Sequence, residues 1–251
     1  MKLNGATALI TGGAVRIGRA ICEALADRGC NVVIHYRNSA REAEKLARRL
    51  TAAGIRAHTV AGDLATLDGC RQVLREAIAK AGNLDILVNN ASIFHRGLPG
   101  SLAEQDALDE LRVNLLAPMF LMRGFAGQAK KGKIINLLDQ RITRTSAEAV
   151  PYQVSKKALA GLTLSAALEL APGISVNGVA PGPVLLPAGS QAGVPEKAGF
   201  IPLKKRPRAS DVAAAVVFLL ESDSITGQII FVDGGQHLLG VRNAPGFVPT
   251  R

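Results

Sequence analysis

The chain has 251 residues, 48% of them hydrophobic, and its 30 lysines and arginines against 20 acidic residues give a formal net charge of +10. This length favours one large α/β domain covering residues 1–251. The basic residues are spread along the chain with few aromatic residues beside them, which argues against a nucleic-acid partner. Small anions, such as a phosphorylated cofactor or a carboxylate-bearing substrate, fit the charge balance equally well.

Targeting and membrane signals are missing from the sequence. No apolar stretch approaches the roughly 20 residues that span a bilayer, and residues 1–5 lack the layout of a signal peptide. Cys22, Cys30 and Cys70 show neither metal-ligand spacing nor a pairing pattern, so we expect no metal site and no disulfide framework. These features predict a cytoplasmic protein without a membrane partner.

Short apolar runs rich in valine and isoleucine alternate with longer segments of helical periodicity. Strands are predicted near 6–11, 31–36, 56–61, 84–88, 133–138, 174–179 and 228–232. Helices are predicted near 17–28, 39–53, 68–80, 105–130, 152–171 and 210–221. Strands that are apolar throughout, such as "KIINLL", are expected where helices cover both faces of a parallel sheet. The alternation therefore predicts an α/β fold, a Rossmann-type doubly wound parallel sheet with helices on both faces.

Two segments do not fit this alternation. Residues 181–203 form the one long region rich in proline and glycine, and their length favours a substrate lid over a simple connection. Residues 239–251 form a C-terminal tail with weak periodicity. We expect this tail either to fray or to dock on a neighbouring molecule.

The stretch "TALITGGAVRIG" (7–18) leads from the first strand through a glycine turn into the first helix. Gly12, Gly13 and Gly18 supply the flexibility and close approach that let a phosphate sit against backbone N–H groups. Glycines after a strand often only end it, but the strand–turn–helix context favours a dinucleotide. Arg16 stands where such turns often have another glycine. Its guanidinium can bind the pyrophosphate or an anionic group of the substrate; the alternative is an ordinary surface arginine.

The second strand ends in "HYRNSA", and this segment bears on the choice of cofactor. Arg37 lies 19 residues beyond Gly18, about where an acidic residue would bind the ribose 2′-hydroxyl of NAD, and no acid follows until Glu42. Arg37, with Asn38 and Ser39, predicts a pocket for a 2′-phosphate and so favours NADP over NAD. The alternative is a solvated arginine and a helix cap by Ser39, and both interpretations can hold at once.

Six motifs stand in order along the chain: "TGGAVRIG", "GDL" (62–64), "NNAS" (89–92), "VN" (113–114), "YQVSK" (152–156) and "APG" (180–182). Together they resemble the short-chain dehydrogenase/reductase family over about residues 5–238. Within that family the chain is most similar to the pteridine reductases, through "TGGAVRIG", "HYRNS", "NNASIF" and "IINLLD". The last motif ends in Asp139, where most relatives carry a serine. The resemblance implies an NADPH-dependent reductase of a dihydropterin or dihydrofolate, and a homotetramer built through helices 105–130 and 152–171.

Tyr152 and Lys156 lie four residues apart, so on a helix they share one face. A free tyrosine has a pKa of about 10, and a nearby ammonium favours the phenolate, so Lys156 should make Tyr152 a usable acid. Asp139 is predicted at the carboxyl end of a central strand, where it can relay a proton to a ring nitrogen, which favours a C=N substrate over a ketone. The alternatives are a core tyrosine with a snorkelling lysine, and an Asp139 that caps the loop or pairs with Arg141 or Arg144.

The remaining site residues are assigned mainly by the resemblance. It implies that Phe94 stacks the pterin against the nicotinamide, that Asn114 holds a water, and that Asp63 receives the adenine amino group. The predicted catalytic residues are Asp139, Tyr152, Lys156 and Asn114. The predicted cofactor-binding residues are Gly12, Arg16, Ile17, Gly18, Tyr36, Arg37, Asn38, Ser39, Asp63, Leu64, Asn90, Ala91, Ser92, Tyr152, Lys156, Pro181 and Gly182. The predicted substrate-binding residues are Arg16, Ser92, Phe94, Asp139 and Tyr152.

Two other functions stay open at the level of sequence. One is a carbonyl or 3-oxoacyl reductase of the same family. The other is a non-catalytic dinucleotide-binding sensor, against which Tyr152, Lys156 and Asp139 argue because a mere binder has no need of all three. The chain also departs from the pteridine reductases, since Ile93 replaces a small polar residue and "PVLLP" in the lid offers no polar group to a pterin.

Overall fold

The computed structural model describes residues 1–95, 103–145, 147, 149–184 and 201–239. Its centre is one sheet of seven parallel strands in the order β3-β2-β1-β4-β5-β6-β7. The strands are β1 (Thr7–Ile10), β2 (Asn31–Tyr36), β3 (Ala57–Ala61), β4 (Ile86–Asn89), β5 (Gly132–Leu137), β6 (Ile174–Pro181) and β7 (Ile229–Val232). The strand order reverses direction between β1 and β4, which is the doubly wound topology expected from the sequence.

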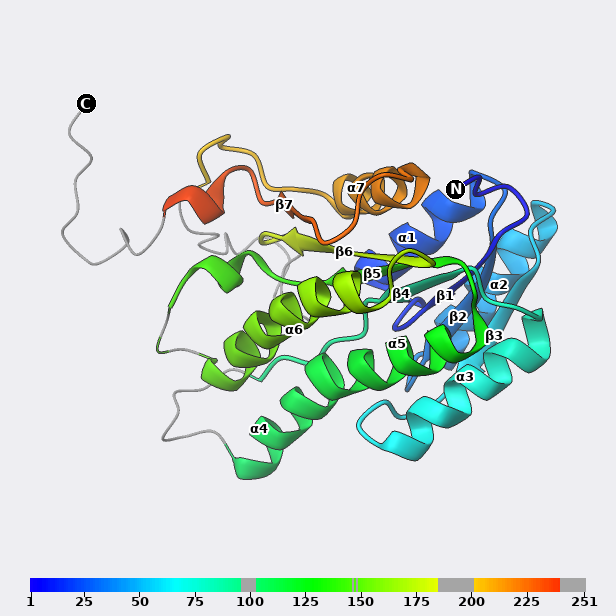
Figure 1. The fold of residues 1–251 in the computed structure, drawn as a ribbon, viewed down its shortest axis with the longest axis horizontal. Coiled ribbons are helices and arrows are strands. Elements are labelled where there is room, and N and C mark those ends of the chain that lie inside the picture. The colour runs from blue at the N-terminus through cyan, green and yellow to red at the C-terminus, as the bar shows by residue number, and fades with distance from the viewer. Residues whose placement is uncertain (96–102, 146, 148, 185–200, 240–251) are drawn as a thin grey trace.

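Helices cover both faces of this sheet (Figure 1). One face carries α1 (Arg16–Ala26), α2 (Ala40–Ala52) and α7 (Ala209–Glu221). The other carries α3 (Leu67–Ala81), α5 (Ala117–Gln128) and α6 (Val150–Glu169), with α4 (Glu104–Leu111) packed against α6. Two short 3₁₀ helices, η2 (Gln140–Thr143) and η3 (Gln236–Leu239), follow β5 and β7. The predicted fold class is confirmed.

The apolar residues of each strand alternate between two cores. In β2, Val32 and Ile34 point into the core under α1 and α2, whereas Val33 points into the core under α3 and α5. Successive side chains of a strand point to opposite faces. A strand covered on both faces is therefore apolar at every position, which is why the continuous apolar runs identified the strands correctly.

Every predicted boundary of a helix or strand lies within two residues of the observed one, but the helix predicted over 105–130 is not continuous. Residues Arg112–Leu116 form a π-helical segment, in which the Ala117 amide donates to the Arg112 carbonyl five residues earlier. Pro118 explains this departure, because it has no amide hydrogen to donate to the Asn114 carbonyl four residues earlier. Wide turns of this kind often occur at functional sites.

The three cysteines are free and buried. Burial raises the pKa of Cys30 to about 12 and that of Cys70 to about 11, and it raises the pKa of Cys22 further still. The expectation that they form no disulfide framework is confirmed.

Parts of two segments singled out in the sequence are not described. Residues 185–200 of the predicted lid and 240–251 of the predicted tail lie outside the described residues. Among those that are described, no helix combines the length and the apolar character that crossing a membrane requires.

Candidate active site

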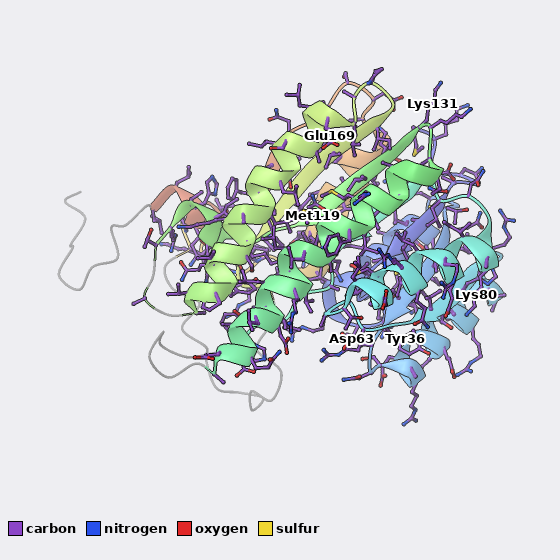
Figure 2. The ribbon with its side chains drawn as sticks, turned by 60° about the horizontal axis from the view of Figure 1, so that its bottom comes forward. Tyr36, Asp63, Lys80, Met119, Lys131 and Glu169 are labelled. Carbon is purple, nitrogen blue, oxygen red and sulfur yellow. The ribbon has the colours of Figure 1, made fainter. Side chains whose placement is uncertain are left out.

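Because all seven strands are parallel, their carboxyl ends lie along one edge of the sheet. The glycine turn follows β1, Ser92 and Phe94 follow β4, and Asp139 follows β5. Figure 2 shows Tyr36 and Asp63 together at this edge, where β2 and β3 end. Ligands of open α/β sheets bind at such an edge, near the point where the strand order reverses.

Two glycines of the turn leave little or no room for a side chain. A Cβ at Gly18 would lie 2.2 Å from the Gly12 carbonyl oxygen. Gly12 has a positive φ of 60°, and a Cβ there would lie 3.1 Å from the Ala91 Cα. The turn is therefore a tight backbone cradle at the start of α1, which is the feature that a pyrophosphate group requires.

Arg16 begins α1 in the left-handed region, with φ of 54°. This conformation costs a residue with a Cβ roughly 1–2 kcal/mol, whereas glycine adopts it freely. The sequence identified Arg16 as a departure from glycine, and the backbone still has the geometry that suits glycine. The side chain is thus retained at a conformational cost.

The turn is fastened to the segment after β4. The Thr11 hydroxyl accepts hydrogen bonds from the amides of Asn90 and Ala91, both at 2.9 Å. The Asn90 side-chain amide donates to the carbonyls of Thr11 and Gly12, at 2.8 and 3.1 Å. Asn90 and Ala91, predicted to bind the cofactor, therefore also shape the cradle.

His35 is a residue of this region that sequence reasoning did not single out. It is 2% exposed, its Nδ1 accepts the Gly12 amide at 3.1 Å, and its Nε2 lies 3.1 Å from the Gly62 carbonyl. Since Nδ1 accepts, Nε2 carries the proton and donates to Gly62. Burial lowers the pKa of His35 to about 4, so the ring is neutral and ties the turn after β1 to the end of β3.

The predicted 2′-phosphate pocket holds a loose ion pair. Arg37 Nη1 lies 4.0 Å from Asp63 Oδ1, and both side chains are about half exposed. Ser39 stands at the N-cap of α2, but its hydroxyl makes no capping hydrogen bond with the helix. The alternative of a cap by Ser39 is therefore wrong for its side chain.

Four other residues predicted to bind the cofactor make packing or backbone contacts within the protein. The Leu64 side chain packs in the core, and Ile17 packs against the core on the opposite face of the sheet. Pro181 ends β6, and the Gly182 amide donates to the Val232 carbonyl at 3.0 Å. A Cβ at Gly182 would lie 2.8 Å from the Asp233 Cα. Contact of these residues with a cofactor stays a prediction.

Tyr152, Asp139 and Lys156 meet at the ends of β5 and α6. The Tyr152 hydroxyl donates to Asp139 Oδ2 at 3.0 Å, and Lys156 Nζ donates to the Leu137 carbonyl at 2.7 Å. Asp139 Oδ1 also accepts the Arg141 amide at 2.7 Å and so caps η2. The expected cap of the loop and the proposed partnership with tyrosine therefore both hold.

The electrostatics of this group differ from the expectation. Burial and the neighbouring Asp139 raise the pKa of Tyr152 well above its usual value. The expected lowering by Lys156 is wrong for this structure, in which Lys156 Nζ lies 5.9 Å from the tyrosine ring centroid and bonds a carbonyl. Burial lowers the pKa of Lys156 to about 8 and raises that of Asp139. Two acids with raised pKa values thus share one hydrogen bond.

Asn114 lies within the π-helical segment and joins three parts of the site. Its Oδ1 accepts the Ser92 hydroxyl at 3.0 Å and the Ile93 amide at 2.9 Å. Its Nδ2 donates to the Ile93 carbonyl at 2.9 Å and to the Ser155 hydroxyl at 3.3 Å. The side chain therefore fixes the segment after β4 against α6.

Phe94 stands beside the Tyr–Asp–Lys group and is 41% exposed. Its ring meets the Tyr152 ring edge-on, with centroids 4.9 Å apart, and the Arg141 guanidinium lies 5.3 Å from its centroid. An exposed aromatic ring held next to the acid pair offers a surface on which a flat heterocycle can stack.

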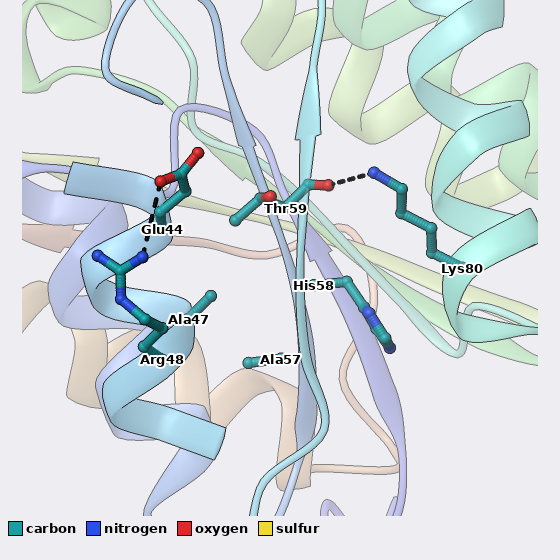
Figure 3. Close-up of a pocket in the computed structure, with 7 residues that line it drawn as sticks. All are labelled: Glu44, Ala47, Arg48, Ala57, His58, Thr59 and Lys80. Carbon is teal, nitrogen blue, oxygen red and sulfur yellow. Dashed lines mark hydrogen bonds and ion pairs between the residues drawn. The ribbon is translucent and has the colours of Figure 1, made fainter. Parts of the chain in front are cut away.

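A shallow groove of about 390 Å³ lies elsewhere, between α2, β3 and α3 (Figure 3). Lys80 Nζ donates to the Thr59 carbonyl at 2.8 Å, and Arg48 pairs with Glu44 at 3.7 Å. Lysine at an edge strand covers a backbone group that could otherwise pair with another chain. Lys80 therefore covers one backbone carbonyl of the edge strand β3.

The cradle, the basic residue after β2 and the Tyr–Asp–Lys group define the class, an oxidoreductase that uses a dinucleotide cofactor. The family model described as enoyl-(acyl carrier protein) reductase matches residues 13–237. The chain belongs to the short-chain dehydrogenase/reductase family, as its motifs had indicated.

Named relatives within this family differ in their activities. The chain is 33% identical over 241 residues to the 3-oxoacyl-[acyl-carrier-protein] reductase FabG of Staphylococcus aureus, covering 92% of this chain and 98% of the relative. It is similar to the FolM alternative dihydrofolate reductase 1 of Brucella canis complexed with NADP, with TM-score 0.90, 34% identity and coverage of 98% and 99%. A short-chain dehydrogenase of Burkholderia cenocepacia, in complex with NADP, matches with TM-score 0.87, 34% identity and coverage of 93% and 98%.

Proposed function

We propose that the protein is an NADPH-dependent reductase of a dihydropterin or dihydrofolate. The observation that carries the proposal is the carboxyl group of Asp139 in hydrogen-bond contact with the Tyr152 hydroxyl. NADP is the cofactor of several structural neighbours, and the glycine cradle and Arg37 fit it. Similarity to the Brucella dihydrofolate reductases supports the substrate class.

Reduction of a C=N bond needs a hydride at carbon and a proton at nitrogen, and NADPH supplies the hydride when bound. The chain supplies the proton. Because the pKa of Tyr152 is raised, its hydroxyl stays protonated at neutral pH. Burial raises the pKa of Asp139, so its carboxyl group holds a proton more readily than an exposed one does. A proton held between these groups can pass to a ring nitrogen placed against them.

Phe94, Ser92 and Arg16 complete the proposed substrate site. Phe94 supplies the stacking surface, the Ser92 hydroxyl adds a hydrogen-bonding group, and Arg16 adds a cation for the pyrophosphate or for an anionic substrate group.

A 3-oxoacyl reductase is the second candidate, favoured by the identity with FabG. NADPH oxidation with dihydrobiopterin, dihydrofolate and an acetoacetyl thioester separates the two. We expect turnover of a pterin or folate, and turnover of the thioester alone would overturn the first proposal.

Asp139→Ser gives a sharper test within the same assay. It replaces the acid by the residue that most relatives carry, so we expect kcat on a dihydropterin to fall by about 10²-fold or more, with unchanged NADPH affinity. Equal activity of the variant and the wild type would refute the role of Asp139.

We further propose that the protein is a homotetramer. Large apolar side chains stand exposed on the outer faces of α5 and α6, with Met119 37%, Leu164 50% and Leu168 84% exposed. Figure 2 shows Met119 on α5 and Glu169 at the end of α6, on the two helices that lie side by side. Burying such a face against a second copy is favourable in water.

A further inference from the structure

Phe94 lies between Ile93 and His95. Side chains of one helical stretch make hydrogen bonds with the backbone of both neighbours. Asn114 bonds both the amide and the carbonyl of Ile93, at 2.9 Å each. On the other side of Phe94, the His95 amide donates to Glu110 Oε1 at 2.5 Å. Glu110 and Asn114 are four residues apart, so they lie on the same face of the helical stretch formed by α4 and the π-helical segment.

Glu110 is an unusual residue for its place. It is the one buried residue of α4, and its side chain is 0% exposed. Its Oε2 has no hydrogen-bond partner among the described residues. The His95 ring faces it, with Nδ1 3.4 Å from Oε1, and Asp106 lies 3.7 Å from Nε2 of the same ring.

A buried carboxyl group with one unsatisfied oxygen is costly, and an apolar residue at this position would avoid that cost. Burial also raises the pKa of Glu110, which means that keeping its carboxyl group ionised lowers the stability of the folded protein. What this group provides is a fixed acceptor for the amide next to Phe94.

We propose that Glu110 is a positioning residue that, with Asn114, clamps the segment 93–95 and so fixes Phe94 as the stacking surface for the substrate ring. The part of this inference that concerns the substrate rests on the proposed function, whereas the clamp itself does not. Glu110 acts through the backbone of His95 and needs no contact with substrate.

The chain contains no tryptophan, so Phe94→Trp introduces a single fluorescent reporter at the clamped position. On this background we compare Glu110→Gln, which keeps an oxygen acceptor, with Glu110→Leu, which removes it. Asp109→Asn is the matched control, because Asp109 lies on the same helix and pairs with Arg112. Circular dichroism and thermal unfolding establish that each variant folds.

We expect the fluorescence anisotropy of the introduced indole to fall in Glu110→Leu and to be unchanged in Glu110→Gln and Asp109→Asn. In the Phe94 background, Glu110→Leu should raise KM for the pterin or folate about tenfold and leave KM for NADPH unchanged, while Glu110→Gln stays near wild type. Equal anisotropy in the leucine and glutamine variants would overturn the clamp.

The two proposals fail in different ways. If the wild type turns over no pterin or folate, the proposed function fails, and the anisotropy comparison still decides the clamp. If a pterin or folate is turned over and Glu110→Leu changes KM for NADPH and for the substrate equally, the link between the clamp and the substrate ring is wrong.

Discussion

Arg16 adopts a backbone conformation that favours glycine and yet carries a long charged side chain. A side chain retained against such a cost indicates use at the site. The sequence was enough to notice that a glycine was missing from the turn. It could not show the left-handed φ of 54°, because most residues other than glycine avoid that region and the residue type gave no sign of it.

We expect Arg16→Gly to separate binding from folding. The free energy of unfolding should stay within about 1 kcal/mol of wild type, since relief of strain offsets the entropy of an added glycine. KM for NADPH should rise about tenfold, because charge-assisted hydrogen bonds are lost. Steady-state kinetics and urea unfolding measure both, with Arg19→Ala on the same helix as control. Unchanged KM values for both NADPH and the substrate would contradict the role of Arg16.

His35 should make folding stability depend on pH. Its pKa is about 4 in the folded protein and 6.5 when unperturbed, so the unfolded chain binds more protons between these values. Stability is then complete above pH 6.5 and declines by up to about 3 kcal/mol as pH falls towards 4. Urea unfolding of wild type and His35→Asn from pH 7.5 to 4.5 tests this. The variant should lack this part of the decline, and His58→Asn should keep it.

The pair formed by Tyr152 and Asp139 shows which properties of single residues the sequence could predict. The spacing of Tyr152 and Lys156 and the place of Asp139 after a strand were enough to expect the three groups together. The direction of the tyrosine pKa was wrong, because burial and the Asp139 carboxyl group at 3.0 Å raise it, while Lys156 bonds the Leu137 carbonyl instead. Distances between groups far apart in sequence decide such shifts, and spacing along the chain does not contain them.

At the scale of the helix, two N-cap residues have different uses. Thr66 caps α3, since its hydroxyl accepts the Gly69 amide at 3.0 Å, whereas the Ser39 hydroxyl makes no such bond to α2. The sequence analysis considered a cap only for Ser39, although both residues are of types that are common at N-caps. Only the structure distinguishes a hydroxyl that caps its helix from one that does not.

We therefore expect opposite effects of two alanine substitutions. Thr66→Ala should lower the free energy of unfolding by about 1 kcal/mol and leave cofactor preference unchanged. Ser39→Ala should leave stability nearly unchanged and raise KM for NADPH about tenfold, with little effect on KM for NADH. Thermal unfolding and kinetics with both cofactors check this pair, and equal loss of stability in the two variants would contradict it.

The π-helical segment escaped prediction although its signal was present. Apolar periodicity continues from α4 into α5, because one wide turn shifts the pattern by only one residue. Pro118 was the available signal, since a proline inside a predicted helix removes one backbone donor. The break places Asn114 where it can reach both Ile93 and Ser155.

For the whole molecule, the alternation of strands and helices was enough to predict the topology. Connections between parallel strands are almost always right-handed, so few arrangements fit such an alternation. The oligomeric state could not be predicted in the same way. The sequence does not distinguish an apolar residue that is exposed on a helix from one that is buried.

Leu168→Glu should reduce the proposed tetramer to a smaller species. A charge at this 84% exposed position would have to be desolvated in the interface. Light scattering after size-exclusion chromatography measures the mass, which we expect to equal four chains for wild type. Leu67→Glu, on an exposed leucine at the start of α3, serves as control. A wild-type mass of one chain would refute the assembly.

The buried thiols have a practical consequence for studying this protein. Maleimides attack the thiolate, and the three native cysteines are both enclosed and held protonated at neutral pH. A cysteine introduced on the surface would therefore be the preferred target for a dye or spin label. Probes can be attached one at a time without removing any of the native sulfur atoms from the core.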